Sequence, residues 1–155
     1  MSKSILVVCT ANICRSPMGE ALVRAQAQKS GYTDWTVHSA GTWAELGQRA
    51  ASYSIEAMKM RGYDISKHRS RQVTLELISQ SDLVLTMTRG HMESLQAEFP
   101  NFHSRIRLFS MLRGVKYDIA DPYGKPTSYY IACADELEDL VNLGWKRLCQ
   151  WLEIA

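Results

Sequence analysis

The chain has 155 residues, which suits a single domain, because one hydrophobic core usually serves roughly 100 to 200 residues. Hydrophobic residues make up 46% and charged residues 22%, a composition that excludes disordered, collagenous and coiled-coil proteins. The net charge is only +2, so it predicts neither nucleic-acid binding nor attachment to an anionic membrane. We therefore expect one domain over residues 1–155, in which any anion is bound by a local site.

The cysteines and the N-terminal residues indicate a reducing compartment. The cysteines are too few for a secreted disulfide scaffold of this size, and their spacing does not match a metal site. They are Cys9, Cys14, Cys133 and Cys149. The apolar run Ile5–Val8 is shorter than the core of a signal peptide, and no stretch reaches the about 20 apolar residues of a membrane span. We expect a cytoplasmic protein with reduced thiols, no membrane association and no bound metal.

The first part of the chain predicts two strands, each followed by a helix. Ser4–Cys9 is almost continuously apolar, as expected of a strand buried on both faces of a sheet. Ser16 suits the cap of the next helix, and Pro17 suits its first position. Thr36–Ala40 is the second predicted strand, and apolar residues at helical spacing then indicate a helix that ends at Gly62.

The second part of the chain continues the alternation. A short helix over Leu75–Ser79 precedes a strand over Asp82–Met87. Thr88 can cap the following helix, and Pro100 ends it. Ile106–Phe109 is the fourth predicted strand.

A long loop over Gly114–Thr127 leads to a final helix with apolar residues at helical spacing. Four strands and about five helices in alternation predict an α/β fold, a doubly wound four-stranded parallel sheet with helices on both faces. In such folds the ligand site lies at the carboxyl ends of the strands.

The eight residues that join the first strand to the first helix carry the predicted chemistry. They are Cys9, Thr10, Ala11, Asn12, Ile13, Cys14, Arg15 and Ser16. The first N–H groups of a helix lack partners and its dipole favours negative charge, so this junction can bind an oxyanion. A thiol there ionises more readily, since the same donors stabilise a thiolate. Arg15 adds a planar fork suited to two phosphoryl oxygens.

A cysteine, five residues, then arginine and serine at this junction resemble the loop of the low-molecular-weight protein tyrosine phosphatases. The resemblance covers nearly the whole chain. It includes Asn12–Pro17, Ser39–Gly41 followed by Trp43, His68–Gln72 and Asp121–Tyr123. The Cys-x5-Arg-Ser spacing alone occurs in phosphatases of other folds, whereas its combination with Asp-Pro-Tyr before the last helix is specific.

The resemblance implies a role for each of these residues. Cys9 would be the nucleophile that forms a phosphocysteine, Arg15 would bind the phosphoryl group, and Asp121 would be the general acid and base. Asn12 would brace the loop and Ser16 would support the cysteine. Trp43 and Tyr123 would form aromatic walls that favour an aryl phosphate. The implied phosphatase needs no metal or cofactor.

The resemblance also implies the partners of the protein. The substrates would be phosphotyrosine proteins, with inorganic phosphate as product or inhibitor and a tyrosine kinase as a candidate partner. Whether the protein is a monomer or a weak dimer stays open. The family commonly has glycine where this chain has Ala11, and alanine at a positive φ would cost about 1 kcal/mol or more.

Other readings of single residues stay open at this stage. Cys14 suits core packing and a reversible disulfide with Cys9 equally well. Trp43 could be a core residue, and Asp121 on its own could be a turn residue. Tyr129 and Tyr130 could be regulatory phosphorylation sites, but we expect them to be surface residues at the start of the last helix. Three histidines are expected to be structural or exposed, namely His38, His91 and His103. His68 could instead fix the conformation of its own loop. Asp118 is expected to be a solvated acid in the late loop.

Two other functions compete with the phosphatase. Thioredoxin-linked arsenate reductases share the fold and a similar first loop, but they use further cysteines in mid-chain, and this chain has none between Cys14 and Cys133. A non-catalytic phosphate-binding module would not need Cys9, Arg15 and Asp121 together. A nucleotide-binding P-loop is excluded because no Gly-Lys-Ser/Thr follows the loop.

Overall fold

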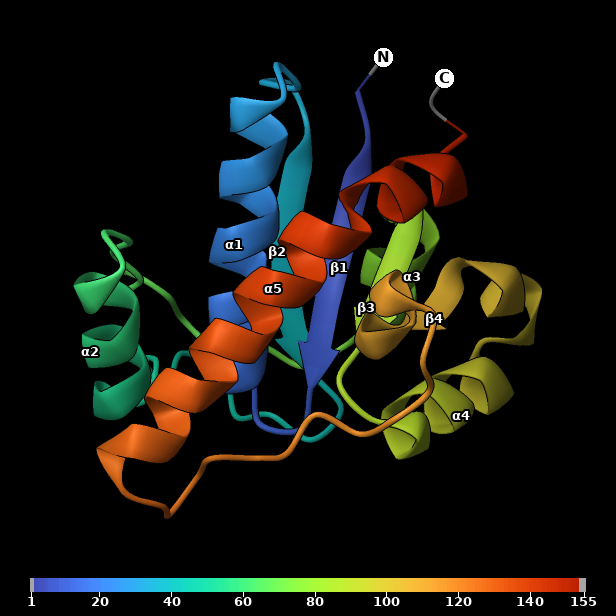
Figure 1. The fold of residues 1–155 in the computed structure, drawn as a ribbon. Helices are drawn as coiled ribbons and strands as arrows, with labels where there is room; N and C mark the ends of the chain where they lie inside the picture. The colour runs from blue at the N-terminus through green and yellow to red at the C-terminus, as the bar shows by residue number, and fades with distance from the viewer. Residues whose placement is uncertain (1, 154–155) are drawn as a thin grey trace.

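A four-stranded parallel sheet forms the centre of the fold, in the order β2-β1-β3-β4 (Figure 1). The strands are β1 (Ser4–Cys9), β2 (Thr36–Gly41), β3 (Leu83–Thr86) and β4 (Ile106–Leu108). The computed structural model describes residues 2–153, so the ends of the expected domain, residues 1 and 154–155, lie outside the described residues. Because the strands are parallel, their carboxyl ends lie at one edge of the sheet, with Cys9 opposite Gly41.

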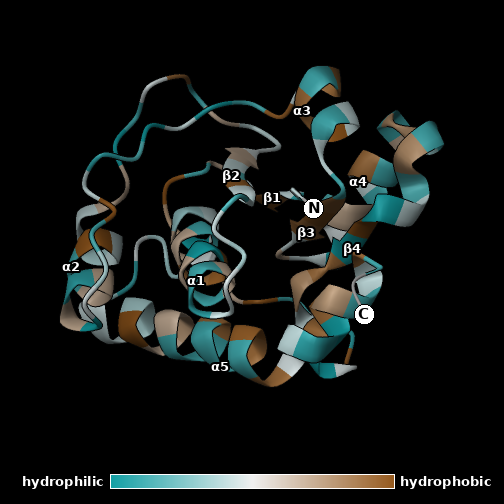
Figure 2. Ribbon diagram, turned by 90° about the horizontal axis from the view of Figure 1, so that it is seen from above, coloured by the Kyte–Doolittle hydropathy of each residue, from teal (hydrophilic) through white to brown (hydrophobic). Residues whose placement is uncertain are grey.

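Helices cover both faces of the sheet, which confirms the predicted fold class (Figure 2). The α-helices are α1 (Arg15–Lys29), α2 (Ser52–Met60), α3 (Leu75–Gln80), α4 (Arg89–Glu98) and α5 (Thr127–Trp151), and the 3₁₀ helices are η1 (Pro100–Arg105) and η2 (Phe109–Arg113). Figure 2 shows α1 and α5 on one side of the sheet and α3 and α4 on the other. The helical connections between the parallel strands therefore lie on both faces of the sheet, as in a doubly wound fold.

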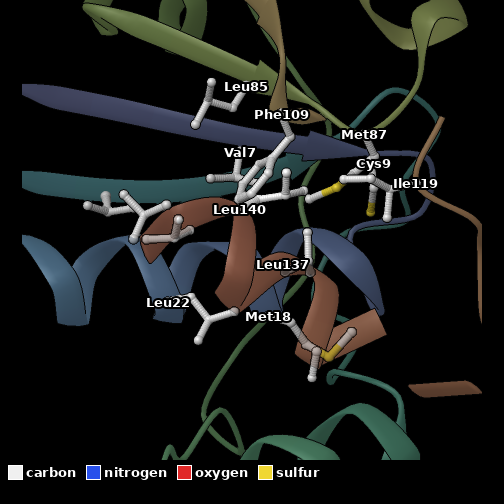
Figure 3. Packing of buried hydrophobic residues seen from close by; sticks show 14 of the residues in the cluster. Val7, Cys9, Met18, Leu22, Leu85, Met87, Phe109, Ile119, Leu137 and Leu140 are labelled. Atoms are coloured by element: carbon white, nitrogen blue, oxygen red, sulfur yellow. The ribbon is translucent and has the colours of Figure 1, made fainter. Parts of the chain in front are cut away.

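Two hydrophobic cores, one on each face, follow from the alternation of side chains along β1. Ile5 and Val7 belong to the larger core with α1 and α5, whereas Leu6 and Val8 belong to the smaller core with α3 and α4. Figure 3 shows the larger core, in which Val7 and Phe109 lie among side chains of α1 and α5. The continuous apolar run of β1 is thus explained by burial on both faces.

The predicted boundaries agree with the observed ones to within about two residues, apart from short 3₁₀ segments. The fourth strand ends at Leu108, and Phe109, which we had assigned to it, begins η2 instead. The cap of α4 is confirmed, because the Thr88 hydroxyl accepts a hydrogen bond from the His91 backbone at 3.1 Å. The prediction that Pro100 ends α4 is consistent with its last residue, Glu98.

The expected start of α1 was wrong. The helix begins at Arg15 with Cys14 as its N-cap, and no side chain caps it. Ser16 lies inside the first turn and its hydroxyl contacts the loop, so it is not available to the helix N–H groups. Pro17 fits the third helical position because N–H groups of the first turn have no partner within the helix.

The segment between η2 and α5, residues 114–126, crosses the carboxyl edge of the sheet below β1 (Figure 1). We call it the acid loop because it contains Asp121. Its middle is fixed by Ile119, a fully buried residue whose N–H donates to the Met87 carbonyl at 2.9 Å. In Figure 3, Ile119 lies beside Met87 near Cys9. Among the described residues, no helix has the length and apolar character needed to span a membrane.

Candidate active site

A pocket of about 470 Å³ opens at the carboxyl end of β1. Most of the predicted site residues line it: Cys9, Thr10, Ala11, Ile13, Cys14, Arg15, Trp43, Asp121 and Tyr123. Two predicted residues, Asn12 and Ser16, are fully buried behind the loop and do not line the pocket. Glu45 and Gln48 also line it, and nothing in the sequence had singled them out.

The Cys9 thiol is buried at the end of β1, with only 2% of the residue exposed. Its sulfur lies 3.0 Å from the Ser16 hydroxyl oxygen, which also accepts a hydrogen bond from Asn12 Nδ2 at 2.8 Å. Asn12 Nδ2 is the donor in its bond with Ser16, so the Ser16 hydrogen is not used there and can point to the sulfur. A hydrogen bond from Ser16 to a charged sulfur would be stronger than one to a neutral sulfur.

Asn12 braces the loop from behind. It has a φ of 59°, a left-handed conformation that asparagine tolerates better than most residues. Its Oδ1 accepts from the Arg71 N–H at 3.0 Å, and its Nδ2 donates to Ser39 Oγ at 2.9 Å. Its carbonyl oxygen lies 2.7 Å from His68 Nε2. Asn12 therefore ties the loop to two other segments, β2 and the segment that contains His68 and Arg71.

The start of the loop is attached to the end of β2. The N–H groups of Thr42 and Trp43 donate to the carbonyl oxygens of Cys9 and Thr10, each at 2.9 Å. Gly41 permits this approach, because a Cβ there would lie 2.3 Å from the Thr10 carbonyl oxygen. A side chain at position 41 would therefore clash with the loop, which explains why the Ser39–Gly41 motif ends in glycine.

Arg15 lies at the start of α1 and is only 4% exposed. Its Nη1 donates to the Ile119 carbonyl at 2.9 Å, and its Nη2 lies 3.4 Å from Asp121 Oδ2. Its Nε is buried and has no hydrogen-bond partner among the described residues. A buried donor of this kind is costly to leave without a partner, so the guanidinium is suited to receive an oxyanion from the pocket.

Asp121 faces the pocket from the acid loop, and its side chain is 48% exposed. Its Oδ1 accepts from the Tyr123 N–H at 3.1 Å, which is an Asx-type turn. Its Oδ2 is the atom near Arg15. Asp121 is therefore both a turn residue and a pocket carboxylate, and the two readings of Asp-Pro-Tyr do not exclude each other.

The rim of the pocket is aromatic. Trp43 is 85% exposed and Tyr123 is 66% exposed, so Trp43 is not a core residue.

Alanine is tolerated at position 11 of the loop, because Ala11 is not among the non-glycine residues with positive φ. No backbone penalty arises where the family commonly has glycine.

Cys14 is a buried core thiol at the start of α1. Its sulfur lies 3.9 Å from the Tyr130 hydroxyl, and burial raises the pKa of the Cys14 thiol to about 11. The expectation of a surface position for Tyr130 was wrong: it is 3% exposed, because the first turn of α5 packs over Cys14, while Tyr129 is exposed as expected. Burial also raises the pKa of Cys133 to about 12.

Two residues outside the predicted site make specific contacts, and one of them, His91, contacts the loop itself. His91, which we expected to be structural or exposed, is buried with its Nε2 2.8 Å from Thr10 Oγ1. Asp118 is half-exposed and accepts from the Arg89 N–H at 2.8 Å, so it is not simply a solvated acid. These contacts join residues far apart in the chain, and no local pattern announces them.

The geometry brings a thiol, a guanidinium and a carboxyl group together in one pocket. Thiol, guanidinium and carboxyl groups so arranged can transfer a phosphoryl group to sulfur and then to water. In the part of the chain that the structure covers, no group of three or more His, Cys, Asp or Glu residues is placed to hold a metal ion.

The family model described as low molecular weight phosphotyrosine protein phosphatase matches residues 4–150. A probable low-molecular-weight protein-tyrosine-phosphatase, EpsP of Ralstonia nicotianae, is 42% identical over 81% of each chain. A protein-arginine-phosphatase of Bacillus subtilis is 34% identical and covers 93% of this chain and 95% of its own.

Solved structures agree with these relatives. The crystal structure of a YwlE mutant from Bacillus subtilis has a TM-score of 0.89 and 33% identity, covering 94% of this chain and 98% of its own. Vibrio vulnificus Wzb in complex with benzylphosphonate has a TM-score of 0.85 and 35% identity, again covering 94% and 98%. This chain belongs to the low-molecular-weight phosphotyrosine protein phosphatase family.

Proposed function

We propose that this protein hydrolyses phosphotyrosine in proteins, and aryl phosphates in general, through a phosphocysteine on Cys9. The observation that carries the proposal is the buried Nε of Arg15, a donor without a partner among the described residues, on a residue that lines the same pocket as Cys9 and Asp121. A phosphoryl group would supply the missing acceptor beside the nucleophile.

In the first step the Cys9 thiolate attacks phosphorus, and the bond between phosphorus and the phenolic oxygen breaks. Asp121, protonated at this stage, gives its proton to the leaving oxygen, so that neutral tyrosine departs. Arg15 and the backbone N–H groups of the loop bind the phosphoryl oxygens on which charge is spread in the transition state. The Ser16 hydroxyl stabilises the sulfur as thiolate before attack and as leaving group afterwards.

In the second step a water molecule attacks phosphorus and the bond between sulfur and phosphorus breaks. The Asp121 carboxylate takes the proton of the water, which returns Asp121 to its acid form. The products are inorganic phosphate and the Cys9 thiolate. Inorganic phosphate is therefore expected to inhibit by occupying the same loop.

The walls of the pocket favour phosphotyrosine as the substrate class. Trp43 and Tyr123 stand at the rim and Ile13 lines the pocket, so a phenyl ring would meet apolar and aromatic surface. Phosphoarginine is a second candidate, because two relatives are named protein-arginine-phosphatases and because Glu45 and Asp121 place carboxylates near a bound guanidinium.

A direct comparison of the two substrates separates them. We expect kcat/KM for a phosphotyrosine peptide to exceed that for the matched phosphoarginine peptide by at least about tenfold, a difference of about 1.4 kcal/mol. A higher kcat/KM for the phosphoarginine peptide would replace phosphotyrosine as the substrate class while leaving the phosphocysteine mechanism in place.

Protein substrates can be captured with variants that bind but do not turn over. Cys9→Ser and Asp121→Ala should retain phosphotyrosine proteins from a native lysate, and Cys149→Ser, which changes a half-buried cysteine on α5, should behave like the unaltered protein. Phosphotyrosine proteins in both captures support the proposal; equal capture by all variants contradicts it. A tyrosine kinase among the captured proteins would identify the proposed partner.

We also propose that the enzyme works in the cytoplasm, as a monomer or weak dimer and without a metal. All four cysteines are free, and the mechanism needs Cys9 as a reduced thiol, which a reducing compartment maintains. Full activity in the presence of a chelator, and loss of activity on oxidation that a thiol reductant reverses, are the expected results.

A further inference from the structure

His91 contacts the phosphate loop from the far side of the sheet edge. It is the third residue of α4, where its N–H donates to the Thr88 cap. Its ring is buried, with 9% of the residue exposed, and Nε2 lies 2.8 Å from Thr10 Oγ1. Thr10 directly follows the nucleophile and lines the pocket. The mechanism above assigns no role to either side chain.

The proton on His91 can be placed from its surroundings. Burial, and secondarily the positive charge of Arg15, lower the pKa of His91 to about 4, so near neutral pH the ring carries one N–H. Nδ1 is buried without a hydrogen-bond partner among the described residues. Buried N–H groups without a partner are rare, so the hydrogen belongs on Nε2, which donates to Thr10 Oγ1.

This bond determines what the Thr10 hydroxyl can do. A hydroxyl has one hydrogen and two lone pairs, and the His91 N–H uses one lone pair. The hydrogen of Thr10 is therefore directed to another acceptor, and the Thr10 residue is exposed at the pocket wall. An anionic phosphoryl group bound in the pocket is an acceptor of the right charge, and a hydrogen bond to it is charge-assisted.

We propose that His91 is a positioning residue that, by donating to Thr10 Oγ1, turns the Thr10 hydroxyl into a hydrogen-bond donor for the phosphoryl group. The inference rests on the proposed function, because it needs a phosphoryl group in this pocket. Thr10 would touch the substrate, whereas His91 acts only through Thr10. The pair adds one side-chain donor to the backbone N–H groups and Arg15.

A double-mutant cycle with inorganic phosphate as the probe tests the pair. Thr10→Val removes the hydroxyl with little change in shape, and His91→Phe keeps a ring without an N–H. Each variant should weaken phosphate inhibition and lower kcat/KM by about tenfold or more, the range for a hydrogen bond to a charged group. The double variant should lose no more than either single variant, because both remove one interaction.

A rescue variant separates positioning from packing. The amide of glutamine places an N–H near the position of Nε2, so His91→Gln should recover phosphate affinity to within about threefold of the unaltered protein, an interval of under 1 kcal/mol. The matched control is His103→Gln on η1, an exposed histidine outside the pocket, which should change nothing. Thermal melting of each variant reports whether it folds.

The outcomes divide clearly. Additive losses in the double variant, or unchanged phosphate affinity in Thr10→Val, would overturn the proposal. If His91→Phe does not fold, the comparison of Thr10→Val with Thr10→Ser still decides, since only the serine variant keeps the donor. Failure of the proposed function has a different signature, namely turnover that survives Cys9→Ala.

Discussion

Arg15 and Ile119 are joined by a hydrogen bond of 2.9 Å from the guanidinium Nη1 to the backbone carbonyl, across 104 positions of the chain. The residue proposed to bind the phosphoryl group therefore also fixes the acid loop, two residues before Asp121. The Ile119 N–H donates to the Met87 carbonyl at the same time, so the loop is held through both backbone polar groups of one residue. The proposed binding of phosphate and the placement of Asp121 therefore depend on one side chain.

Arg15→Lys should impair both functions while keeping the charge. Lysine cannot contact a phosphoryl group and Ile119 with one planar group, so kcat/KM should fall at least about 100-fold, as for loss of a transition-state donor. The Ile119 amide should also exchange its hydrogen faster, which hydrogen-exchange mass spectrometry measures. Arg113→Lys, which changes an exposed arginine at the end of η2, is the control. Unchanged exchange at Ile119 would show that Arg15 does not hold the acid loop.

Asp121→Asn should have an effect that depends on the leaving group. A general acid matters most when the leaving oxygen is basic, so kcat/KM should fall at least about 100-fold for phenyl phosphate and about tenfold or less for p-nitrophenyl phosphate. The measurement is kcat/KM for a series of aryl phosphates of graded basicity, because this ratio reports the step in which the phenol leaves and not the later hydrolysis of the phosphocysteine. Asp118→Asn, whose carboxylate contacts Arg89, should not change the series. An equal loss for every leaving group would exclude Asp121 as the acid.

Cys14 should make the fold sensitive to alkaline pH. Burial raises the pKa of its thiol from 9.0 to about 11, so the unfolded chain releases this proton at lower pH than the folded chain does. The contribution of the neutral thiol is fully present below pH 9.0 and is lost as pH rises through about 11, at a total of about 3 kcal/mol.

Urea unfolding at a series of pH values measures this effect. Cys14→Ala should reduce the fall in unfolding free energy across that window, although Cys133 contributes in the same direction. Val23→Ala, a buried change without a titratable group, should lower stability equally at all pH values. A pH profile of Cys14→Ala parallel to that of the unaltered protein would refute the assignment.

Gly144→Ala should destabilise the packing of α5 on η2. A Cβ at Gly144 would lie 2.5 Å from both the Cβ and the carbonyl oxygen of Leu112, so the helix or η2 must shift, at a cost of about 1–3 kcal/mol. Thermal or urea unfolding measures the loss. The matched change Gly90→Ala in α4 meets only Thr88 Oγ1 at 3.7 Å and should be neutral or stabilising. Equal stability of the two variants would contradict the close approach.

The sheet and its order of elements were predictable from sequence, because β1 is apolar on both faces and turn residues separate the periodic segments. The two 3₁₀ helices were not, since single turns have no periodicity to detect. Ser16 shows a different limit: its position favours a cap, and only the folded loop reveals that Asn12 and Cys9 occupy its hydroxyl.

Site residues that lie close together in the sequence were predictable, whereas contacts that form only through folding were not. Cys9 through Ser16 lie in one segment, and strand-loop-helix physics alone identified them as an anion site. Asp121 needed the family resemblance, because an Asp-Pro turn has no chemistry of its own. The contacts of His91 with Thr10 and of Tyr130 with Cys14 depend on tertiary packing over 81 and 116 positions, which no local pattern encodes.

The phosphocysteine on Cys9 is the central claim, and rapid quenching of the enzyme during turnover of a phosphotyrosine peptide tests it most directly. Mass spectrometry of the quenched protein should find one phosphoryl group on the peptide that contains Cys9, and Cys9→Ala should show neither this adduct nor turnover. A phosphoryl group on another residue, or turnover by Cys9→Ala at a rate near that of the unaltered enzyme, would contradict it.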